Sequence, residues 1–490
     1  MANATAAPSG LAGHPPGLQT LFFTEMWERF SYYGMRALLI LYMTAGVATG
    51  GLGFDVPKAA AIYGLYTGMV YFTALPGGWI ADRLLGQKRA VFIGGVLIAL
   101  GHVSIATGSL TLFYAGLVII VLGTGLLKPN ISSIVGQLYS ADDPRRDAGF
   151  SLFYMGINLG AWISPLVCGY LAQHESFRHV LAAVGIHVEH TWHWGFGAAA
   201  VGMTAGLVQY VLGQGRLAGV GELREPAPNR ALAWAGVAAS LAVLGAVIWL
   251  AWEWRYVLML VATVAFFAWL MAQARSAMER HRTMALIALF VFSVLFWAAF
   301  EQAGSSLNLF AEHRTRLSLF GFDVPTSWLQ SANAMFIWML APFFAWLWVR
   351  LGPREPSSPA KFAFGLLFAG LGFVVVAVAA WVSSNAGDAR VSILWLIGVY
   401  LLHTIGELCL SPVGLSTVTK LAPERLVGSM MGVWFLSLSL GNFLGGWTAG
   451  FFEVLPLPKL FGAVALTTIA SGAVLALLVP PIKRLMSGVH

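Results

Sequence analysis

The chain has 490 residues, of which 58% are hydrophobic and only 10% are charged, and its formal net charge is +7. About a quarter of the residues of a soluble domain are charged, so this composition excludes an ordinary soluble enzyme and indicates an integral membrane protein. The positive charge fits basic loops beside a membrane better than binding to nucleic acid. Cys168 and Cys409 lie in apolar runs and do not form a disulfide framework.

Apolar runs long enough for a membrane helix, about 20 residues, follow one another along the chain. They are continuous rather than short and alternating, which favours helices over a β-barrel. Residues 1–17 are expected to form a tail, because no basic stretch precedes the first span as it would in a signal peptide. We predict fourteen transmembrane helices, at 18–44, 57–81, 89–108, 110–137, 148–174, 192–214, 231–251, 256–274, 283–312, 327–349, 361–384, 391–420, 427–452 and 458–481.

The loops between these spans predict the orientation of the chain. With residues 1–17 placed inside, eighteen Lys and Arg residues, Arg224 and Arg425 among them, fall in inner loops and seven fall in outer loops. This bias agrees with the positive-inside rule. Both termini are therefore expected in the cytoplasm, and the protein in the inner (plasma) membrane.

The chain also shows a weak internal repeat. Trp27-Glu28-Arg29 resembles Phe300-Glu301-Gln302, and the glycine pair 160 and 169 recurs at 441 and 450. Two parallel halves of six helices are the layout of major facilitator transporters. We therefore predict an all-α major facilitator fold with bundles at 18–214 and 283–484, joined by a segment, 215–282, that carries an inserted transmembrane hairpin at 231–274.

Charged residues inside membrane spans are costly and usually functional. The first span carries several of them on one face, because at about 100° per residue four polar positions fall within an arc of about 60°. These positions are Glu25, Arg29, Tyr32 and Arg36, with Glu28 and Tyr33 on the two flanks. Such a stripe must face water or polar partners rather than lipid, so we predict that the first span lines an aqueous cavity.

Two further charges lie in equivalent spans of the two halves, next to prolines that allow a kink. Lys128 precedes Pro129, and Glu407 lies five residues before Pro412. A zwitterionic substrate held between the halves would meet a cation at one end and an anion at the other. His403 lies on nearly the same face as Glu407, and we expect it to pack rather than to bind.

Several stretches resemble the proton-coupled oligopeptide transporter family of the major facilitator superfamily. Residues 25–34 (EMWERFSYYG) resemble its ExxERFxYYG motif, and residues 153–160 (FYMGINLG) resemble its FYxxINxG motif. Residues 300–302 (FEQ) and 406–412 (GELCLSP) resemble two other conserved stretches, and residues 77–89 resemble the general superfamily loop. The resemblance covers essentially the whole chain, and the hairpin at 231–274 resembles that of bacterial members.

The resemblance implies that the protein imports di- and tripeptides with protons. The positions that it assigns to the peptide carboxylate are Arg29, Arg36 and Lys128. The positions that it assigns to the amino group are Asn158, Asn333 and Glu407, and those around the peptide are Tyr32, Tyr33, Tyr71 and Trp434. It further implies that Asp82 and Arg83 gate the cytoplasmic side. No histidine occurs in the second span, where animal relatives use one, so proton coupling is expected to depend on carboxylates.

Electrostatics suggests a hypothesis for that coupling. A carboxylate in a cavity of low dielectric resists ionisation unless a cation pairs with it. Protonation of Glu301 would therefore release Arg36 to bind the peptide carboxylate. Glu25, Glu28 and Arg29 form either a second coupling site or a structural network of salt bridges, and both interpretations stay open.

The main alternative is a major facilitator transporter that couples protons to another small solute, such as a drug or a sugar. Such a protein would not need three cations directed at a carboxylate. An enzyme is not expected, because the sequence shows no phosphate loop, zinc motif or nucleophilic serine motif. We expect no cofactor and no metal. The partners that we expect are small peptides, protons and the lipid bilayer, without nucleic acid, and we expect a monomer.

Overall fold

The computed structural model describes residues 13–487 except 141, 142, 144, 224, 225, 251–253, 320 and 424–426. Most of the expected tail 1–17 therefore lies outside the described residues, and so do Arg224 and Arg425, which were predicted in inner loops. The described part is almost entirely helical, as the composition indicates.

The helices follow one another with short connections. The first half of the chain contains α1 (Pro16–Thr44), α2 (Val56–Phe72), α3 (Ala74–Ile80), α4 (Gln87–Ala106), α5 (Leu110–Gln137), α6 (Arg146–Gln173), α7 (Glu175–Ala183) and α8 (Trp192–Gly213). The remainder contains α9 (Arg230–Leu250), α10 (Arg255–Ala272), α11 (Ala277–Phe300), α12 (Ser306–Arg314), α13 (Ser331–Leu351), α14 (Ser358–Asn385), α15 (Leu394–Leu421), α16 (Val427–Ala449) and α17 (Leu457–Leu485).

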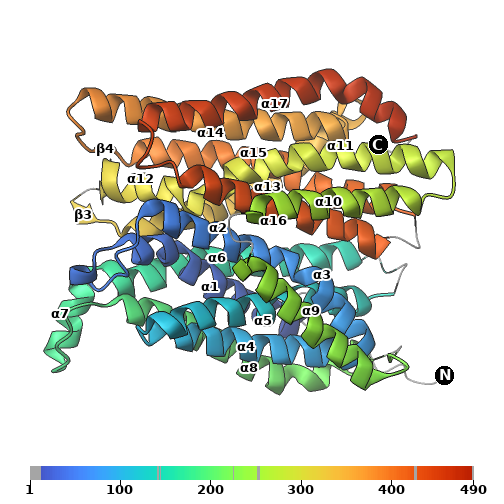
Figure 1. Cartoon of the computed structure of the whole chain (residues 1–490), viewed down its shortest axis with the longest axis horizontal. Coiled ribbons are helices and arrows are strands. Elements are labelled where there is room, and N and C mark those ends of the chain that lie inside the picture. The colour runs from blue at the N-terminus through green and yellow to red at the C-terminus, as the bar shows by residue number, and fades with distance from the viewer. Residues whose placement is uncertain are drawn as a thin grey trace.

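Short helical turns and strands connect some of these helices. The turns are η2 (Val47–Thr49), η3 (Ala81–Leu85), η4 (Gln214–Leu217), η6 (Glu301–Gly304), η7 (Thr326–Gln330) and η8 (Gly352–Arg354). The strands are β1 (Thr315–Arg316), β2 (Ser318–Leu319), β3 (Phe322–Asp323) and β4 (Val391–Ser392). Strand β1 pairs in parallel with β4, and β2 pairs antiparallel with β3, all at the end of the molecule where α7 lies (Figure 1).

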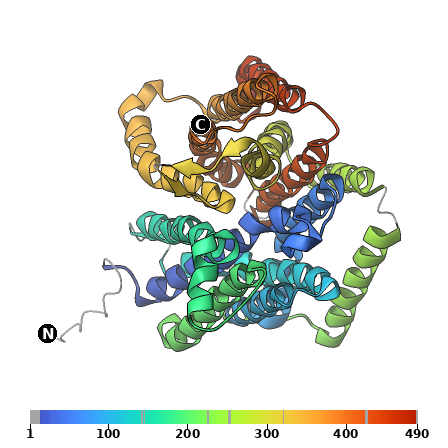
Figure 2. The same ribbon diagram turned by 90° about the vertical axis from the view of Figure 1, so that its left-hand side faces the viewer.

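The helices gather into two bundles that lie one above the other in Figure 1. In one bundle α1 packs against α6 and α8, and α4 packs against α5 and α8. In the other, α14 packs against α15 and α17, and α11 packs against α16. The α9–α10 pair lies at the edge of the molecule (Figure 2), where the ring of Phe267 in α10 meets that of Phe290 in α11 at 4.7 Å.

Each of the fourteen ranges expected to span a membrane contains a helix. Within the described residues, nine helical stretches are both long and apolar enough to cross a bilayer by length and composition. Large apolar side chains on these bundles are exposed, for example Leu212 (82%), Val349 (83%) and Leu477 (79%). Such a surface suits hydrocarbon rather than water, and the chain is therefore an integral membrane protein.

Three of the differences between the structure and the predicted boundaries are the following. Helix α11 begins at Ala277 rather than at 283, because the Ser276 hydroxyl caps it by accepting a hydrogen bond from the Glu279 amide at 3.2 Å. The range 174–192 was interpreted as an outer loop, yet it contains helix α7. The predicted span 283–312 is interrupted by the turn η6 at Glu301–Gly304, which the apolar pattern does not reveal.

The two bundles meet where α2 crosses α16 and where α6 faces α13. At the first crossing the backbones touch directly: a Cβ atom added to Gly64 would lie 2.9 Å from the Cα atom of Gly446. At the second, the Trp328 indole donates to the Leu166 carbonyl at 2.9 Å, and the Ser331 hydroxyl donates to the Trp162 carbonyl at 2.7 Å. These bonds join α6 to η7 and α13 at the α7 end of the molecule.

Candidate functional site: a charged cavity between the bundles

A cavity of about 240 Å³ lies between the two bundles. It is lined by α1, α2, α5 and α6 of one bundle and by α11, η6, α13, α15 and α16 of the other. The predicted site residues in its lining are Glu25, Arg29, Tyr33, Arg36, Tyr71, Lys128, Asn158, Glu301, Asn333, Glu407 and Trp434. Charged side chains from α1, α5, η6 and α15 thus converge on one space, as the prediction of an aqueous cavity requires.

One buried charge pair of this cavity joins the two bundles. A guanidinium Nη2 of Arg36 in α1 donates to the Glu301 carboxylate, and both side chains are at most 7% exposed. The Nε of Arg36 also donates to the Tyr63 hydroxyl at 2.7 Å. A buried ion pair is stable only when further hydrogen bonds satisfy its remaining groups, and Tyr63 supplies one of them.

The helix break at η6 brings Glu301 to this pair. Helix α11 ends at Phe300, and Glu301–Gly304 turn as a 3₁₀ segment before α12 begins. A Cβ atom at Gly304 would lie 1.7 Å from the Tyr63 hydroxyl and 3.1 Å from Nε of Arg36. Only glycine at position 304 therefore lets the broken segment approach the arginine this closely.

A second charge cluster lies two to three turns earlier in α1. The Nε of Arg29 lies 3.0 Å from a carboxylate oxygen of Glu25 and also pairs with Glu28. All three side chains are at most 3% exposed, and the Arg29 guanidinium lies 5.3 Å from the ring centre of Tyr32. Glu25 and Arg29 line the cavity, whereas Glu28 lies behind them.

The cation predicted in the fifth helix faces the same space. The Lys128 ammonium lies 4.0 Å from the ring centre of Tyr71 in α2. An ammonium over an aromatic face is attracted by the electrons of the ring, which keeps Lys128 directed across α2 and toward the cavity. Lys128 and Glu407 therefore line the same cavity, as expected from the sequence.

The opposite bundle supplies the anionic end. The Asn333 amide in α13 donates to the Glu407 carboxylate and to the Thr404 hydroxyl, each at 3.0 Å. Asn158 in α6 uses its amide nitrogen on the Tyr154 carbonyl at 3.0 Å, and it still lines the cavity. Glu407 thus keeps carboxylate acceptor capacity toward the open space, which suits an ammonium group.

Tyr32 of the predicted stripe and Glu28 on its flank do not line the cavity. Tyr32 belongs to a buried cluster with Tyr63 and Tyr66 of α2, and its hydroxyl has no hydrogen-bond partner among the described residues. The stripe is therefore rotated toward the Tyr33 flank, because α2 covers the side of α1 that carries Tyr32 and Glu28. The helical pattern identified the polar face but could not show which neighbour would cover its edge.

Sequence reasoning missed several lining residues that helical spacing could have identified. Tyr154 precedes Asn158 by one turn, Tyr400 precedes Glu407 by two turns, and Ser411 follows Glu407 by one turn. Trp297 precedes Glu301 by one turn, and Gln330 precedes Asn333 by one turn. Phe300 lines the cavity without such a signal. His403 lines the cavity, and it also packs with ring centres 5.2 Å from Phe373 and 6.0 Å from Phe300.

The residues predicted to gate the cytoplasmic side lie far along the chain from these charges, in the turn η3. Asp82 accepts a hydrogen bond from the Gln87 amide at 3.2 Å, and the Arg83 carbonyl accepts one from the Ala227 amide at 2.9 Å. The segment after α8 is further held by Lys88, which lies 2.5 Å from Glu222. This loop therefore anchors the segment that leads to the α9–α10 pair.

Two helical bundles around a central, mixed-charge cavity define a transporter of the major facilitator type. The chain belongs to the POT family, whose model matches residues 88–463. It is similar to the peptide transporter YePEPT of Yersinia enterocolitica, with 43% identity over 99% of this chain and 98% of that protein. It is 36% identical to a di-/tripeptide transporter of Lactococcus lactis over the whole of both chains.

Solved structures show the same similarity. A crystal structure of a mutant peptide transporter POT in complex with alafosfalin matches this fold with a TM-score of 0.88. That protein is 43% identical to this chain, and the match covers 99% of this chain and 98% of that one. The predicted major facilitator fold and the predicted family are thus confirmed.

Proposed function

We propose that the protein is a symporter that imports di- and tripeptides together with protons by alternating access. The observation that carries this proposal is the buried pair of Arg36 and Glu301, which joins the two bundles across a cavity that also holds Lys128 and Glu407. The printed names of the relatives, a peptide transporter and a di-/tripeptide transporter, support the choice of substrate.

The arrangement of charges fits a zwitterionic peptide. Its carboxylate is bound by Arg36 and Lys128, helped by Arg29, because arginine offers paired donors to a carboxylate. Its ammonium group is bound by Glu407, which Asn333 holds in place. Asn158, Tyr33, Tyr71 and Trp434 surround the peptide, and Tyr32 acts only from behind, through Arg29.

Proton coupling follows from the same pair. Protonation of Glu301 removes its charge and frees Arg36, which then binds the peptide carboxylate. Release of the proton into the cytoplasm restores the ion pair and weakens the hold on the peptide. Arg29 with Glu25 and Glu28 forms the second coupling group, because a peptide carboxylate near Arg29 competes with both glutamates.

The moving parts are the bundle 18–214 and the bundle 283–484, joined by 215–282. We place the α7 end outward. Bonds between α6 and η7–α13 support closure there, among them the bond of 2.6 Å that the Ser327 hydroxyl donates to the Gln173 side chain. Asp82 and Arg83 lie at the cytoplasmic end and steady the loop during opening. We place the protein in the inner (plasma) membrane as a monomer, with both termini in the cytoplasm.

Purified protein in liposomes tests this proposal. Labelled dialanine is expected to accumulate when the outside is more acidic than the inside, and to equilibrate only when a protonophore removes the gradient. An N-acetylated dipeptide, which lacks the ammonium that Glu407 binds, serves as the matched poor substrate. Accumulation of a sugar or a cationic drug without any gradient-driven peptide uptake would refute the proposal and favour the alternative.

A further inference from the structure

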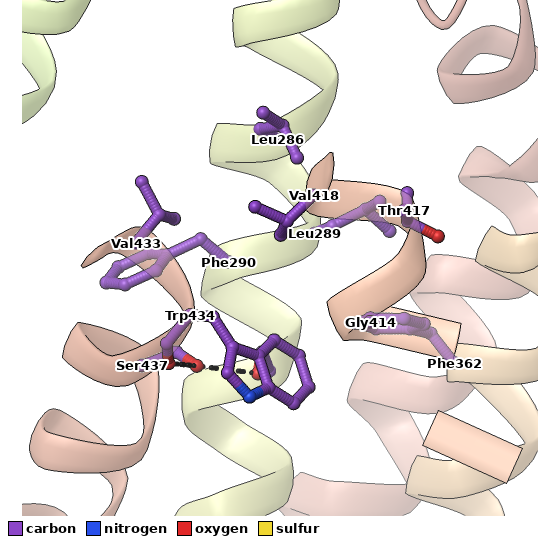
Figure 3. Close-up of a pocket in the computed structure, with 11 residues that line it drawn as sticks. Leu286, Leu289, Phe290, Phe362, Gly414, Thr417, Val418, Val433, Trp434 and Ser437 are labelled. Atoms are coloured by element: carbon purple, nitrogen blue, oxygen red, sulfur yellow. Dashed lines mark hydrogen bonds between the residues drawn. The ribbon is translucent and has the colours of Figure 1, made fainter. Parts of the chain in front are cut away.

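The indole of Trp434 separates the central cavity from a second, much smaller void. Trp434 lines both spaces. The void measures about 20 Å³ and lies between α11, α14, α15 and α16 (Figure 3). Its wall is mainly apolar, formed by Leu286, Leu289, Phe290, Val418 and Val433. A space of this size holds about one water molecule and cannot take an aromatic ring.

The six-membered ring of the indole lies close to the backbone of α15 at Gly414. A Cβ atom added there would lie 2.1 Å from Cζ3 and 2.3 Å from Cη2 of Trp434. Both atoms belong to the six-membered ring, the part of the indole farthest from its own backbone. No side chain therefore fits at position 414 unless the ring moves.

The backbone of α16 at Trp434 is also held in place, so it cannot shift to make room for a side chain at position 414. The Ser437 hydroxyl donates to the Trp434 carbonyl at 2.7 Å and lies 2.9 Å from the Ser293 hydroxyl of α11, a contact drawn in Figure 3. The Trp297 ring meets the indole edge to face, with centres 6.1 Å apart. Because helix α16 is held here and the void is too small, the indole can move only toward the central cavity.

We propose that Gly414 is a positioning residue that sets the size of peptide side chain the transporter accepts. It does so by letting the indole of Trp434 lie close to α15, out of the space that a bulky apolar side chain needs. The substrates that depend on it are peptides with aromatic or other large apolar side chains, while dialanine does not. This inference rests on the proposed peptide transport and adds the residue that sets its selectivity.

Gly414→Ala tests the inference by adding one methyl group. In liposomes its uptake of alanyl-phenylalanine and phenylalanyl-alanine, relative to dialanine, is expected to fall by about tenfold, the usual discrimination for one methylene in an apolar pocket. Gly398→Ala is the matched control, because Gly398 lies in the same helix and a Cβ atom there meets nothing within 4 Å. Its uptake ratio is expected to equal that of the wild type.

A second substitution distinguishes positioning from general damage. Phenylalanine at position 434 lacks the outer ring atoms that meet Gly414, so Gly414→Ala combined with Trp434→Phe is expected to restore the uptake ratio. An unchanged ratio in Gly414→Ala, an equal loss for all three peptides, or a double variant without rescue would overturn the inference. If Gly414→Ala does not fold, Trp434→Phe alone decides, because it should raise the relative uptake of the phenylalanine peptides and an unchanged ratio refutes the idea. A wild-type protein that carries none of these peptides would instead overturn the proposed function.

Discussion

Replacing Glu301 by glutamine removes the negative charge of the pair between the bundles while keeping its size. Loss of one partner from a buried ion pair costs about 3–5 kcal/mol. The glutamine oxygen can still accept a hydrogen bond from Arg36, and a bond to a charged group contributes about 1.5–3 kcal/mol. The Tyr63 hydroxyl, 2.7 Å from Nε of Arg36, is neutral and cannot replace the lost charge. The net destabilisation is therefore about 2 kcal/mol.

A bound peptide carboxylate would supply the missing charge, so this energy should reappear as tighter binding. About 2 kcal/mol corresponds to a gain of roughly 30-fold in affinity. The variant cannot release a proton from position 301, so it should lose the part of the pH dependence of its affinity that comes from Glu301, while any part that comes from Glu25 and Glu28 should remain. A gradient of one pH unit provides about 1.4 kcal/mol for each proton, or about tenfold accumulation, and the variant should lose this accumulation.

Two measurements on the same liposomes check this reasoning. Exchange of labelled for unlabelled dialanine needs no net proton movement and should persist in Glu301→Gln, while uphill uptake should stop. Glu175→Gln is the control, because Glu175 is a carboxylate with an 80% exposed side chain at the surface of the protein. Full accumulation by Glu301→Gln would show that the proton binds elsewhere, and loss of exchange in a folded variant would show that Glu301 serves binding rather than coupling.

Three further predictions concern the ends of the cavity and its supports. Asn333→Ala removes the amide that holds Glu407. We expect about a tenfold loss of affinity for peptides with a free ammonium group, as one hydrogen bond to a charged group predicts, and little change for N-acetylated peptides. Equal losses for both kinds of peptide in competition assays would contradict this role of Asn333. Ser327→Ala removes one hydrogen bond between the bundles, worth about 1 kcal/mol. The distribution of distances between spin labels on α6 and α13 at the α7 end should widen. An unchanged distribution would show that this bond does not keep the two bundles together at that end. The Lys88 ammonium lowers the pKa of Glu222 by hydrogen bonding to it, so this contact is complete above the ordinary carboxyl pKa and is lost as the pH falls through the lowered value. Lys88→Gln should lower the protection of the segment after α8 from hydrogen exchange at neutral pH and leave peptide uptake near normal. Equal protection factors at low and neutral pH in the wild type would contradict this.

The sequence predicted the helices well, because hydrocarbon imposes long apolar runs that can be read directly. It did not predict the break in the span at 283–312. The turn η6 depends on Arg36 and Tyr63, which lie more than 200 residues earlier and leave room only for Gly304. Helix α7 was missed for a different reason: it is short and amphipathic, so it lacks the hydropathy of a span.

The candidate site was predictable as a set of charges but not as a geometry. Periodicity placed Glu25, Arg29 and Arg36 on one face of the first helix, and all three line the cavity. It also placed Tyr32 there, yet α2 covers that edge, and the pattern of one helix carries no information about its neighbours. Trp297 and Phe300 were missed because aromatic residues in a membrane helix look alike whether they face lipid, core or cavity.

The crossing of α2 and α16 has a consequence for the rate at which the protein changes between its conformational states. Because Gly64 and Gly446 bring the two backbones together without side chains between them, the bundles can roll over one another here without any interlocked side chain having to disengage. We expect this contact to serve as the pivot about which the two bundles rotate and to add little to the energy barrier between states. Larger residues at these two positions should lengthen the dwell time in each state before they alter what the cavity binds.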